Sequence, residues 1–294
     1  MKLGIYLPTM MPSGLTGRDV ADWGRLADRA GFHVLATLDR PNYDSWDGFA
    51  ALAGMATITE RIRLSTMTIQ LPARNEVLVA KQAAVIDNLS GGRFELGVSL
   101  GSRRDDYDAL GAPWDGRVGR FRDQVAKIRD IWSQARGSTD ADGVLGPAPV
   151  QVPGPPIWMG GYVPAAVERA IELGDGYTFG GNRFPPDIAD DVASIRRRAQ
   201  ELGKDRFVIS SMLYIAVGDE ETARDEMWRQ LGRYYRENLG GEPKDWGVYG
   251  PVEKLADVVQ GFADAGVDVL LLAPQIQDLG QLEIVAETIL PDYL

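Results

Sequence analysis

The sequence predicts an α/β protein with a single (β/α)8 barrel, of the TIM type, over residues 1–294. Apolar segments typical of strands alternate with helical patterns along the whole chain, and eight strands can be counted, each followed by a helix. Such alternation indicates a parallel sheet whose outer face is covered by helices. The length agrees, because a closed (β/α)8 barrel takes about 250 residues.

The first half of the chain is expected to supply four strands and four helices. Thr16 followed by Asp19 resembles a capping box, and Gly31 is placed to end the helix that this box opens. Ser90 and the two glycines after it end the third helix, and a strand follows at once. The expected strands are 2–7, 32–38, 62–69 and 94–100, and the expected helices are 16–30, 47–59, 75–89 and 117–134.

The second half continues the alternation with two longer connections. Residues 135–156 are rich in glycine and proline and are expected to be extended. Residues 238–250 combine glycines with Trp246 and Tyr249, which is typical of a mobile loop that covers a barrel active site. The expected strands are 157–160, 176–179, 207–217 and 267–273, and the expected helices are 164–173, 186–202, 219–238, 251–265 and 279–290.

Composition excludes several functions. The net charge of −11 disfavours nucleic acid and anionic membranes as partners. The absence of cysteine excludes thiolate catalysis and zinc–sulfur sites and fits a cytoplasmic protein. His33 is the single histidine and begins a strand, away from the expected site, so a Ser-His-Asp triad and a His-liganded metal are not expected. No apolar run reaches the roughly 20 residues that span a bilayer.

Three motifs carry a family resemblance. They are Ile-Arg-Leu at 62–64, Ile-Asp-Asn-Leu-Ser-Gly-Gly-Arg at 86–93 and Leu-Gly-Val-x-x-Gly at 96–101. Together with Pro-Pro-Ile-Trp-Met-Gly-Gly at 155–161, they resemble the bacterial luciferase-like flavin and deazaflavin oxidoreductases. The resemblance implies a hydride-transfer enzyme whose cofactor binds at the C-terminal ends of the strands.

The resemblance also implies where the cofactor lies. Its ring would rest on a bulge in the third strand with a cis peptide between non-proline residues, here Met67 and Thr68. Its phosphate would approach glycine-rich turns at the start of two helices, where backbone N–H groups and the helix dipole favour an anion. The cofactor-binding residues expected on this basis are Thr66, Met67, Thr68, Gly101, Ser102, Gly160, Gly161, Tyr162, Gly180, Gly181, Asn182 and Arg183.

Asp39 and Arg40 end the second strand, where many relatives read Asp-His. Asp39 is therefore the expected catalytic residue for proton transfer, and Arg40, which stays charged, is expected to anchor a negative group. The alternative is an exposed Asp39–Arg40 ion pair of little consequence. Ser102 stands where sugar-phosphate dehydrogenases of the family carry a catalytic glutamate, which argues against that substrate class.

The expected cofactor is coenzyme F420, a deazaflavin, and FMN with O2-dependent monooxygenation is the alternative. A non-catalytic relative that only binds a flavin also stays open, because the family histidine and glutamate are missing. The substrate is expected to be a small apolar or aromatic molecule, since four aromatic side chains lie near the expected site (Tyr43, Trp46, Trp114 and Trp246). Small residues in helices 47–59 and 75–89 favour a homodimer.

Overall fold

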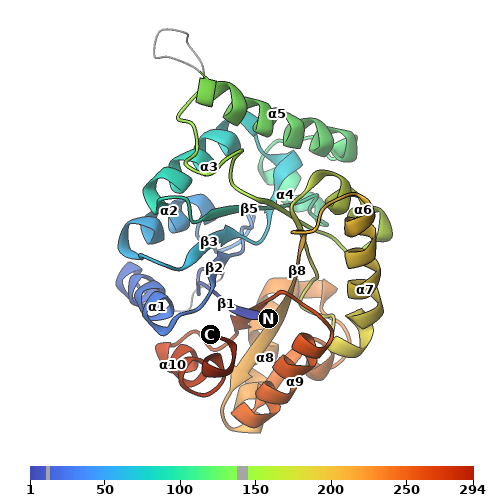
Figure 1. Ribbon diagram of the computed structural model, residues 1–294. Coiled ribbons are helices and arrows are strands. Elements are labelled where there is room, and N and C mark those ends of the chain that lie inside the picture. The colour runs from blue at the N-terminus through green and yellow to red at the C-terminus, as the bar shows by residue number, and fades with distance from the viewer. Residues whose placement is uncertain (11–13, 138–144) are drawn as a thin grey trace.

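A computed structural model of the chain describes residues 1–10, 14–137 and 145–294 (Figure 1). In that described part, parallel strands close into a barrel with eight positions, as the sequence predicts. β10 pairs with β8 on one side and with β1 on the other, where Lys2 faces Val269. The barrel strands are β1 (Lys2–Tyr6), β2 (Val34–Thr37), β3 (Arg63–Thr66) continued by β4 (Ile69–Gln70), β5 (Phe94–Ser99), β6 (Ile157–Gly160), β7 (Gly176–Thr178), β8 (Val208–Val217) and β10 (Val269–Pro274).

Helices cover the outside of the barrel. Side chains cap many of them at the expected places: Thr16 and Asp19 form a reciprocal capping box, and Asp219 accepts from the Thr222 N–H. The covering helices are α1 (Gly17–Ala30), α2 (Gly48–Ile58), α3 (Glu76–Ser90), α5 (Arg117–Gly137), α6 (Pro164–Leu173), α7 (Pro185–Glu201), α9 (Val252–Asp264) and α10 (Leu279–Thr288).

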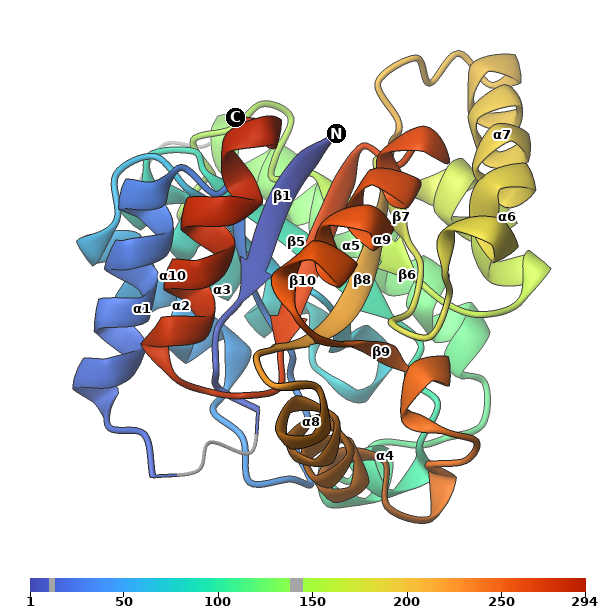
Figure 2. The same ribbon diagram turned by 90° about the horizontal axis from the view of Figure 1, so that it is seen from below.

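Two further helices, α4 (Arg104–Ala109) and α8 (Glu220–Tyr235), lie beyond the C-terminal ends of the strands (Figure 2). This end of the barrel is called the mouth below. In (β/α)8 barrels the loops at this end carry the chemistry. The sequence did not predict α4, because its segment Arg-Asp-Asp-Tyr-Asp-Ala reads as a short charged loop.

The molecule has two apolar cores, because successive residues of each strand point to opposite faces. Ile5, Leu35 and Leu64 face outward and pack against the helices. Tyr6 and Tyr214 face inward, toward the mouth end of the barrel interior. The alternation decides which residues of each strand can reach the mouth.

Three predicted segments can be compared closely with the structure. The third strand is broken after Thr66 and resumes at Ile69, which is the expected bulge. The expected mobile loop 238–250 is instead partly ordered: residues Gly247–Gly250 form a strand, β9, that pairs in parallel with Tyr214–Val217 of β8. Of the expected extended connection 135–156, residues 138–144 lie outside the described residues, and 135–137 belong to α5.

Among the described residues, no helix has the length and apolar character needed to cross a bilayer.

Candidate active site at the mouth of the barrel

The bulge in the third strand contains the expected cis peptide between Met67 and Thr68. Tyr6, on β1, donates a hydrogen bond from its hydroxyl to the Met67 carbonyl at 3.0 Å. On the other side, the Thr66 hydroxyl lies 2.9 Å from both the N–H and the carbonyl of Gly97. The bulge is therefore held from β1 and from β5.

Gly97 is the residue that lets the bulge approach β5. A Cβ atom on Gly97 would lie 1.7 Å from the Thr66 carbonyl oxygen, which no neighbouring backbone can tolerate. This close approach is a physical reason for the glycine in the Leu-Gly-Val motif.

The bulge faces the ends of β6 and β7. A Cβ atom placed on Gly160 would lie 3.4 Å from the Thr68 methyl group and 3.2 Å from the Thr178 methyl group. Two expected residues, Thr68 and Gly160, are thus brought together. Thr178 joins them and was missed, because a threonine inside a short strand gives no signal in the sequence.

The two glycine turns after β6 and β7 lie side by side, since Gly160 pairs with Thr178. The Tyr177 hydroxyl donates to the Gly161 carbonyl at 2.5 Å. The ring of Tyr162 covers Gly180, where a Cβ atom would lie 2.3 Å from it. Gly161 and Gly180 therefore belong to one surface, and their contact with a phosphate stays a prediction.

Helices α6 and α7 begin directly after these turns. Within the described residues, neither N-cap side chain, Val163 or Phe184, makes a capping hydrogen bond. Both helices begin with proline, which has no N–H, and the N–H groups of Ala166 and Asp187 already bond to the Val163 and Phe184 carbonyls. The positive ends of the two helix dipoles therefore remain as the feature that favours an anion there.

The remaining expected phosphate ligands are Asn182 and Arg183. Asn182 is exposed, and Gly181 before it is buried against Tyr214. The Arg183 guanidinium donates to the Asp187 carbonyl at 2.7 Å and pairs with Asp191 at 2.8 Å. Its charge is therefore balanced by α7, and its contact with a phosphate stays a prediction.

Asp39 lies on the helix side of the sheet rather than in the mouth. Its carboxylate accepts from Arg74 and lies against Gly48 at the N-terminus of α2. Burial raises the pKa of Asp39, although the Arg74 charge opposes this rise. The alternation along β2 explains the position, because Leu38 faces the interior and the next side chain must face outward.

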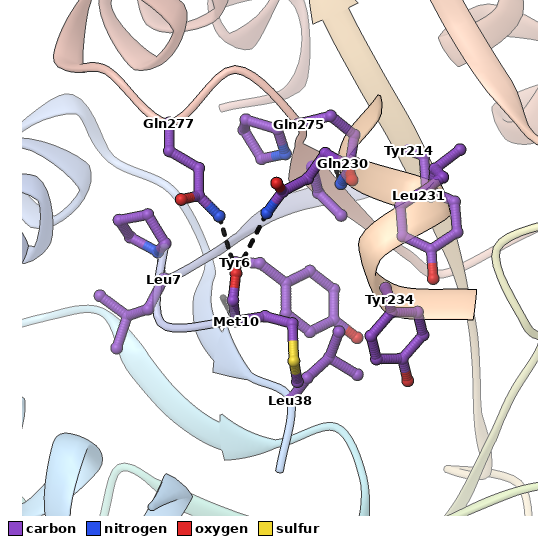
Figure 3. A pocket seen from close by; sticks show the side chains of 13 residues that line it. Tyr6, Leu7, Met10, Leu38, Tyr214, Gln230, Leu231, Tyr234, Gln275 and Gln277 are labelled. Atoms are coloured by element: carbon purple, nitrogen blue, oxygen red, sulfur yellow. Dashed lines mark hydrogen bonds between the residues drawn. The ribbon is translucent and has the colours of Figure 1, made fainter. Parts of the chain in front are cut away.

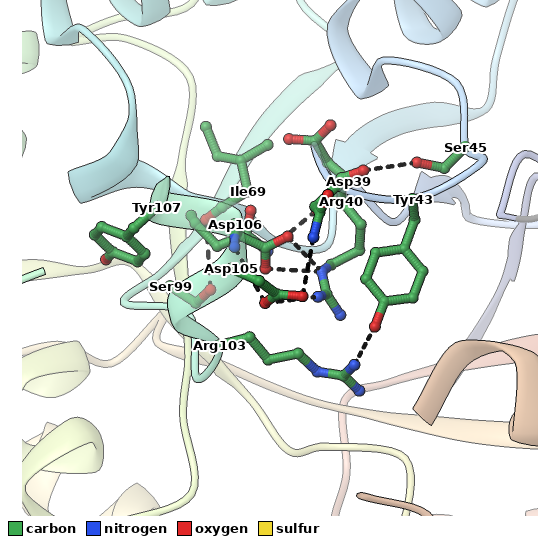
Figure 4. Close-up of polar contacts among 12 residues, drawn as sticks. Asp39, Arg40, Tyr43, Ser45, Ile69, Ser99, Arg103, Asp105, Asp106 and Tyr107 are labelled. Atoms are coloured by element: carbon green, nitrogen blue, oxygen red, sulfur yellow. Dashed lines mark hydrogen bonds and ion pairs between the residues drawn. The ribbon is translucent and has the colours of Figure 1, made fainter. Parts of the chain in front are cut away.

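Arg40 lies at the mouth and is only 5% exposed. It does not form a surface pair with Asp39, so that alternative is wrong; its Nε atom instead lies 2.9 Å from Asp106 of α4 (Figure 4). Burial raises the pKa of the Asp106 carboxyl, against the influence of Arg40. Burial also opposes the charge of Arg40, but Tyr234 and Asp106 outweigh it and raise the Arg40 pKa.

Two buried polar atoms at the mouth lack hydrogen-bond partners among the described residues. One is Nη2 of Arg40 and the other is Oε1 of Gln70, the last residue of β4. Gln70 packs against Gly101, whose φ of 72° requires glycine at this turn. Ser102, beside it, is exposed. Buried polar atoms without partners are costly, so both mark places where a bound molecule can supply the missing partner.

Aromatic side chains close the mouth from the α8 side. The Tyr214 and Tyr235 hydroxyls are 2.8 Å apart, and the ring centroids of Tyr235 and Trp246 are 4.4 Å apart. Beside them lies a cavity of about 40 Å³, lined by Tyr6, Leu38 and Tyr234 among others (Figure 3). The sequence predicts that the tyrosines at the end of α8 pack in the core of the protein. In the structure they line the mouth.

Among the described residues, no three His, Cys, Asp or Glu side chains lie together so that they could hold a metal ion.

The barrel, the bulge with its cis peptide and the paired glycine turns define a barrel protein of the bacterial luciferase type. A family model described as luciferase-like monooxygenase matches residues 1–267. The chain therefore belongs to the luciferase-like monooxygenase family.

The names of similar proteins state different substrates and cofactors. The chain is 26% identical over 216 residues to a 5,10-methylenetetrahydromethanopterin reductase of Methanolobus tindarius, covering 72% of this chain and 65% of that protein. It is 28% identical over 245 residues to an FMNH2-dependent dimethylsulfone monooxygenase of Pseudomonas putida, covering 77% and 67%. The chain thus spans less than two thirds of the first relative's length.

The fold is also that of a coenzyme F420-dependent tetrahydromethanopterin reductase from Methanopyrus kandleri. The two structures align with a TM-score of 0.77 and 19% identity, covering 100% of this chain and 99% of that one.

Proposed function

We propose that this chain is an oxidoreductase that transfers a hydride between coenzyme F420 and a small organic substrate at the mouth of the barrel. The observation that carries the proposal is the bulge at Met67–Thr68, held by Tyr6 and Gly97 and facing the glycine turns. This arrangement offers a flat support for a ring beside a site for an anion, which suits a phosphate-bearing flavin or deazaflavin.

The residues at the mouth fit such a cofactor. Thr66, Met67 and Thr68 would support the ring, and Gly101 and Ser102 would border it. Gly160, Gly161, Tyr162, Gly180, Gly181, Asn182 and Arg183 would surround the phosphate and its linker. Tyr162, which is 63% exposed, covers Gly180 and would have to turn away. The unpartnered Nη2 of Arg40 could donate to a ring carbonyl or to the substrate.

The bound cofactor would supply the hydride chemistry, and the protein would supply position and electrostatics. The bulge and its supports fix the plane of the ring. Arg40 would fix a negative group beside it, because its Nη2 donor has no hydrogen-bond partner among the described residues while its Nε pairs with Asp106. The aromatic side chains at the end of α8, with Trp246 just before β9, would exclude water from the mouth.

A second candidate is an FMN-dependent monooxygenase that uses O2. It is supported by the relative from Pseudomonas putida, whose name states FMNH2 dependence and which the chain matches over 77% of its own length. The same support for the ring and the same anion site serve either cofactor. The discriminating experiment is to purify the chain and identify its chromophore by absorbance and mass. A deazaflavin supports the first proposal and FMN supports the second.

Cofactor binding should depend on the N-terminus of α6. Ala165 is exposed in the first turn of this helix. In Ala165→Asp, the new carboxylate should stabilise the helix through its dipole but repel a phosphate, so we expect at least tenfold weaker cofactor binding with unchanged or higher thermal stability. Titration of the apoprotein with F420 and with FMN measures this effect.

Ala165→Asn is the matched control, because it has the same size without the charge and should bind cofactor within about twofold of wild type. Equal affinity of the Asp and Asn variants for both cofactors would contradict the assignment of the phosphate site.

A further inference from the structure

We propose that the mouth binds the carboxylate of a small apolar acid, through three guanidinium groups gathered on Tyr43. This inference names the substrate class for the proposed function and rests on it. The three groups belong to Arg40, Arg103 and Arg236, which come from the ends of β2, β5 and α8.

The three arginines surround one tyrosine ring. The Cζ atoms of Arg40 and Arg236 both lie 4.2 Å from the centroid of the Tyr43 ring, and that of Arg103 lies 5.6 Å from it. Arg103 also donates to the Tyr43 hydroxyl (Figure 4). Tyr234 of α8 completes the platform, with Arg40 and Arg103 each 5.4 Å from its ring centroid. Cation–π contacts hold these cations in place without neutralising them.

The guanidinium group of Arg40 offers a hydrogen-bond donor to a ligand. Only 5% of Arg40 is exposed, and its Nε atom pairs with Asp106. Its Nη2 atom has no hydrogen-bond partner among the described residues, and the nearest further carboxylate oxygen, of Asp105, is 4.0 Å away. A buried N–H of a charged group that lacks a partner is costly, and a carboxylate oxygen would remove that cost.

The charged side chains around Tyr43 carry a net positive charge, which one bound anion would balance. Three arginines face two carboxylates, since Asp106 and Asp105 both pair with Arg40, at 2.9 and 4.0 Å. In the described residues no carboxylate lies within ion-pair distance of Arg103. A net positive site in a chain whose net charge is −11 is therefore suited to a monoanion.

The body of the ligand should be apolar. The cavity of about 40 Å³ adjoins the arginines, because Tyr234 belongs to both and Leu38 is two residues before Arg40. Leu7, Leu38 and Leu231 are among its lining residues (Figure 3). A cavity of this size admits only a small apolar end of the ligand, about one methyl group, so the rest of an acid held by the guanidiniums would lie in the mouth itself.

The test compares acids with their uncharged amides of the same shape. Benzoate and benzamide, phenylacetate and phenylacetamide, and hexanoate and hexanamide are titrated calorimetrically into the purified protein with its cofactor bound. We expect at least one acid to bind about tenfold or more tightly than its amide. In Arg103→Met and in Arg236→Met that preference should fall about tenfold, while amide binding is unchanged.

Arg229→Met is the matched control, since Arg229 is an exposed residue of α8 that pairs with Glu226. It should keep the full preference for the acid. The proposal is overturned if no acid binds more tightly than its amide, or if the preference survives in both Arg103→Met and Arg236→Met. Binding heat does not depend on turnover, and cofactor loading is read separately by absorbance, so failure of the proposed redox function would be recognised independently.

Discussion

Gly97 is a single residue on which the geometry of the candidate site depends. Because a Cβ atom there would lie 1.7 Å from the Thr66 carbonyl, Gly97→Ala must displace either β5 or the bulge. We expect a loss of about 3 kcal/mol or more in the free energy of unfolding, measured with denaturant, together with weakened cofactor binding.

Gly119→Ala is the matched control for that substitution. Gly119 lies in α5, and a Cβ atom there would meet nothing within 4 Å. Alanine should therefore raise the free energy of unfolding by up to about 1 kcal/mol through helix propensity. A Gly97→Ala protein as stable as this control would show that the bulge does not need the glycine.

Asp39 is the residue whose proposed role is most directly testable. Because its carboxylate lies outside the mouth and pairs with Arg74, we expect Asp39 to act by positioning the loop after β2, and Asp39→Asn should lower turnover by about 10²-fold at most while cofactor binding survives. Arg74→Met removes the partner of the carboxylate and keeps the carboxylate itself. In steady-state kinetics, equal losses in the two variants indicate that the ion pair positions the loop, and a loss only in Asp39→Asn indicates that the carboxylate acts without its partner. Wild-type turnover in Asp39→Asn would contradict the prediction.

The sequence predicted part of the site and missed the rest for a physical reason. Turns with glycine, such as those at Gly160 and Gly180, are visible because their backbone requirement is local. The direction of Asp39 and the gathering of Arg103 and Arg236 on Tyr43 depend on strand alternation and on contacts between distant segments. A single amino-acid sequence does not show which distant side chains are in contact.

At the scale of elements, α1 is joined to the start of β3 by one carboxylate. Asp28 accepts hydrogen bonds from the N–H groups of Glu60, Arg61 and Ile62 at 2.9, 3.0 and 2.7 Å. Burial alone would raise the pKa of Asp28, but these bonds outweigh it and lower the pKa below 3.8. The contact ties the first helix to the segment that leads from α2 into β3.

This contact should contribute stability with a definite pH dependence. A lowered folded-state pKa means that the contribution is present above pH 3.8 and is lost as the pH falls through the folded-state value. Asp28→Asn should therefore cost about 2 kcal/mol at pH 7 in denaturant unfolding, and less below pH 3.8. Asp22→Asn, an exposed change on the same helix, should cost about 0.5 kcal/mol or less. A pH-independent cost at position 28 would contradict the carboxylate's role.

The elements were predicted from sequence wherever hydrophobic periodicity was strong, as in 2–7 or 251–265. They were missed where a segment gains its structure from a neighbour. β9 is an example, because glycines flank its two strand-forming residues, Val248 and Tyr249, and it is a strand only through its pairing with β8.

At the scale of the whole molecule, an apolar stripe lies exposed on the outside of the barrel, along α3. Leu78 and Leu89 of α3 are 60% and 47% exposed, and Val85 lies between them on the same helix face. Together with the small residues of α2, this stripe supports the homodimer expected from the sequence. We expect Leu89→Lys to convert the dimer to a monomer in light scattering at micromolar concentration.

Leu202→Lys is the control for assembly, since Leu202 is similarly exposed but ends α7. It should leave the dimer intact. A wild-type chain that is monomeric at micromolar concentration would contradict the prediction outright.

The pairing of β1 with β10 has a consequence for the order of events during synthesis. Lys2 leaves the ribosome long before its partner Val269 is made, because all the other strands of the barrel lie between them in the chain. Until then the edges of β1 and β8 have no neighbour on that side, and exposed edges invite pairing with other chains. Contacts between residues so far apart in sequence also form slowly. Chains that stop before residue 269 should therefore be collected by chaperones or aggregate, whereas completion of the last strand removes both edges at once.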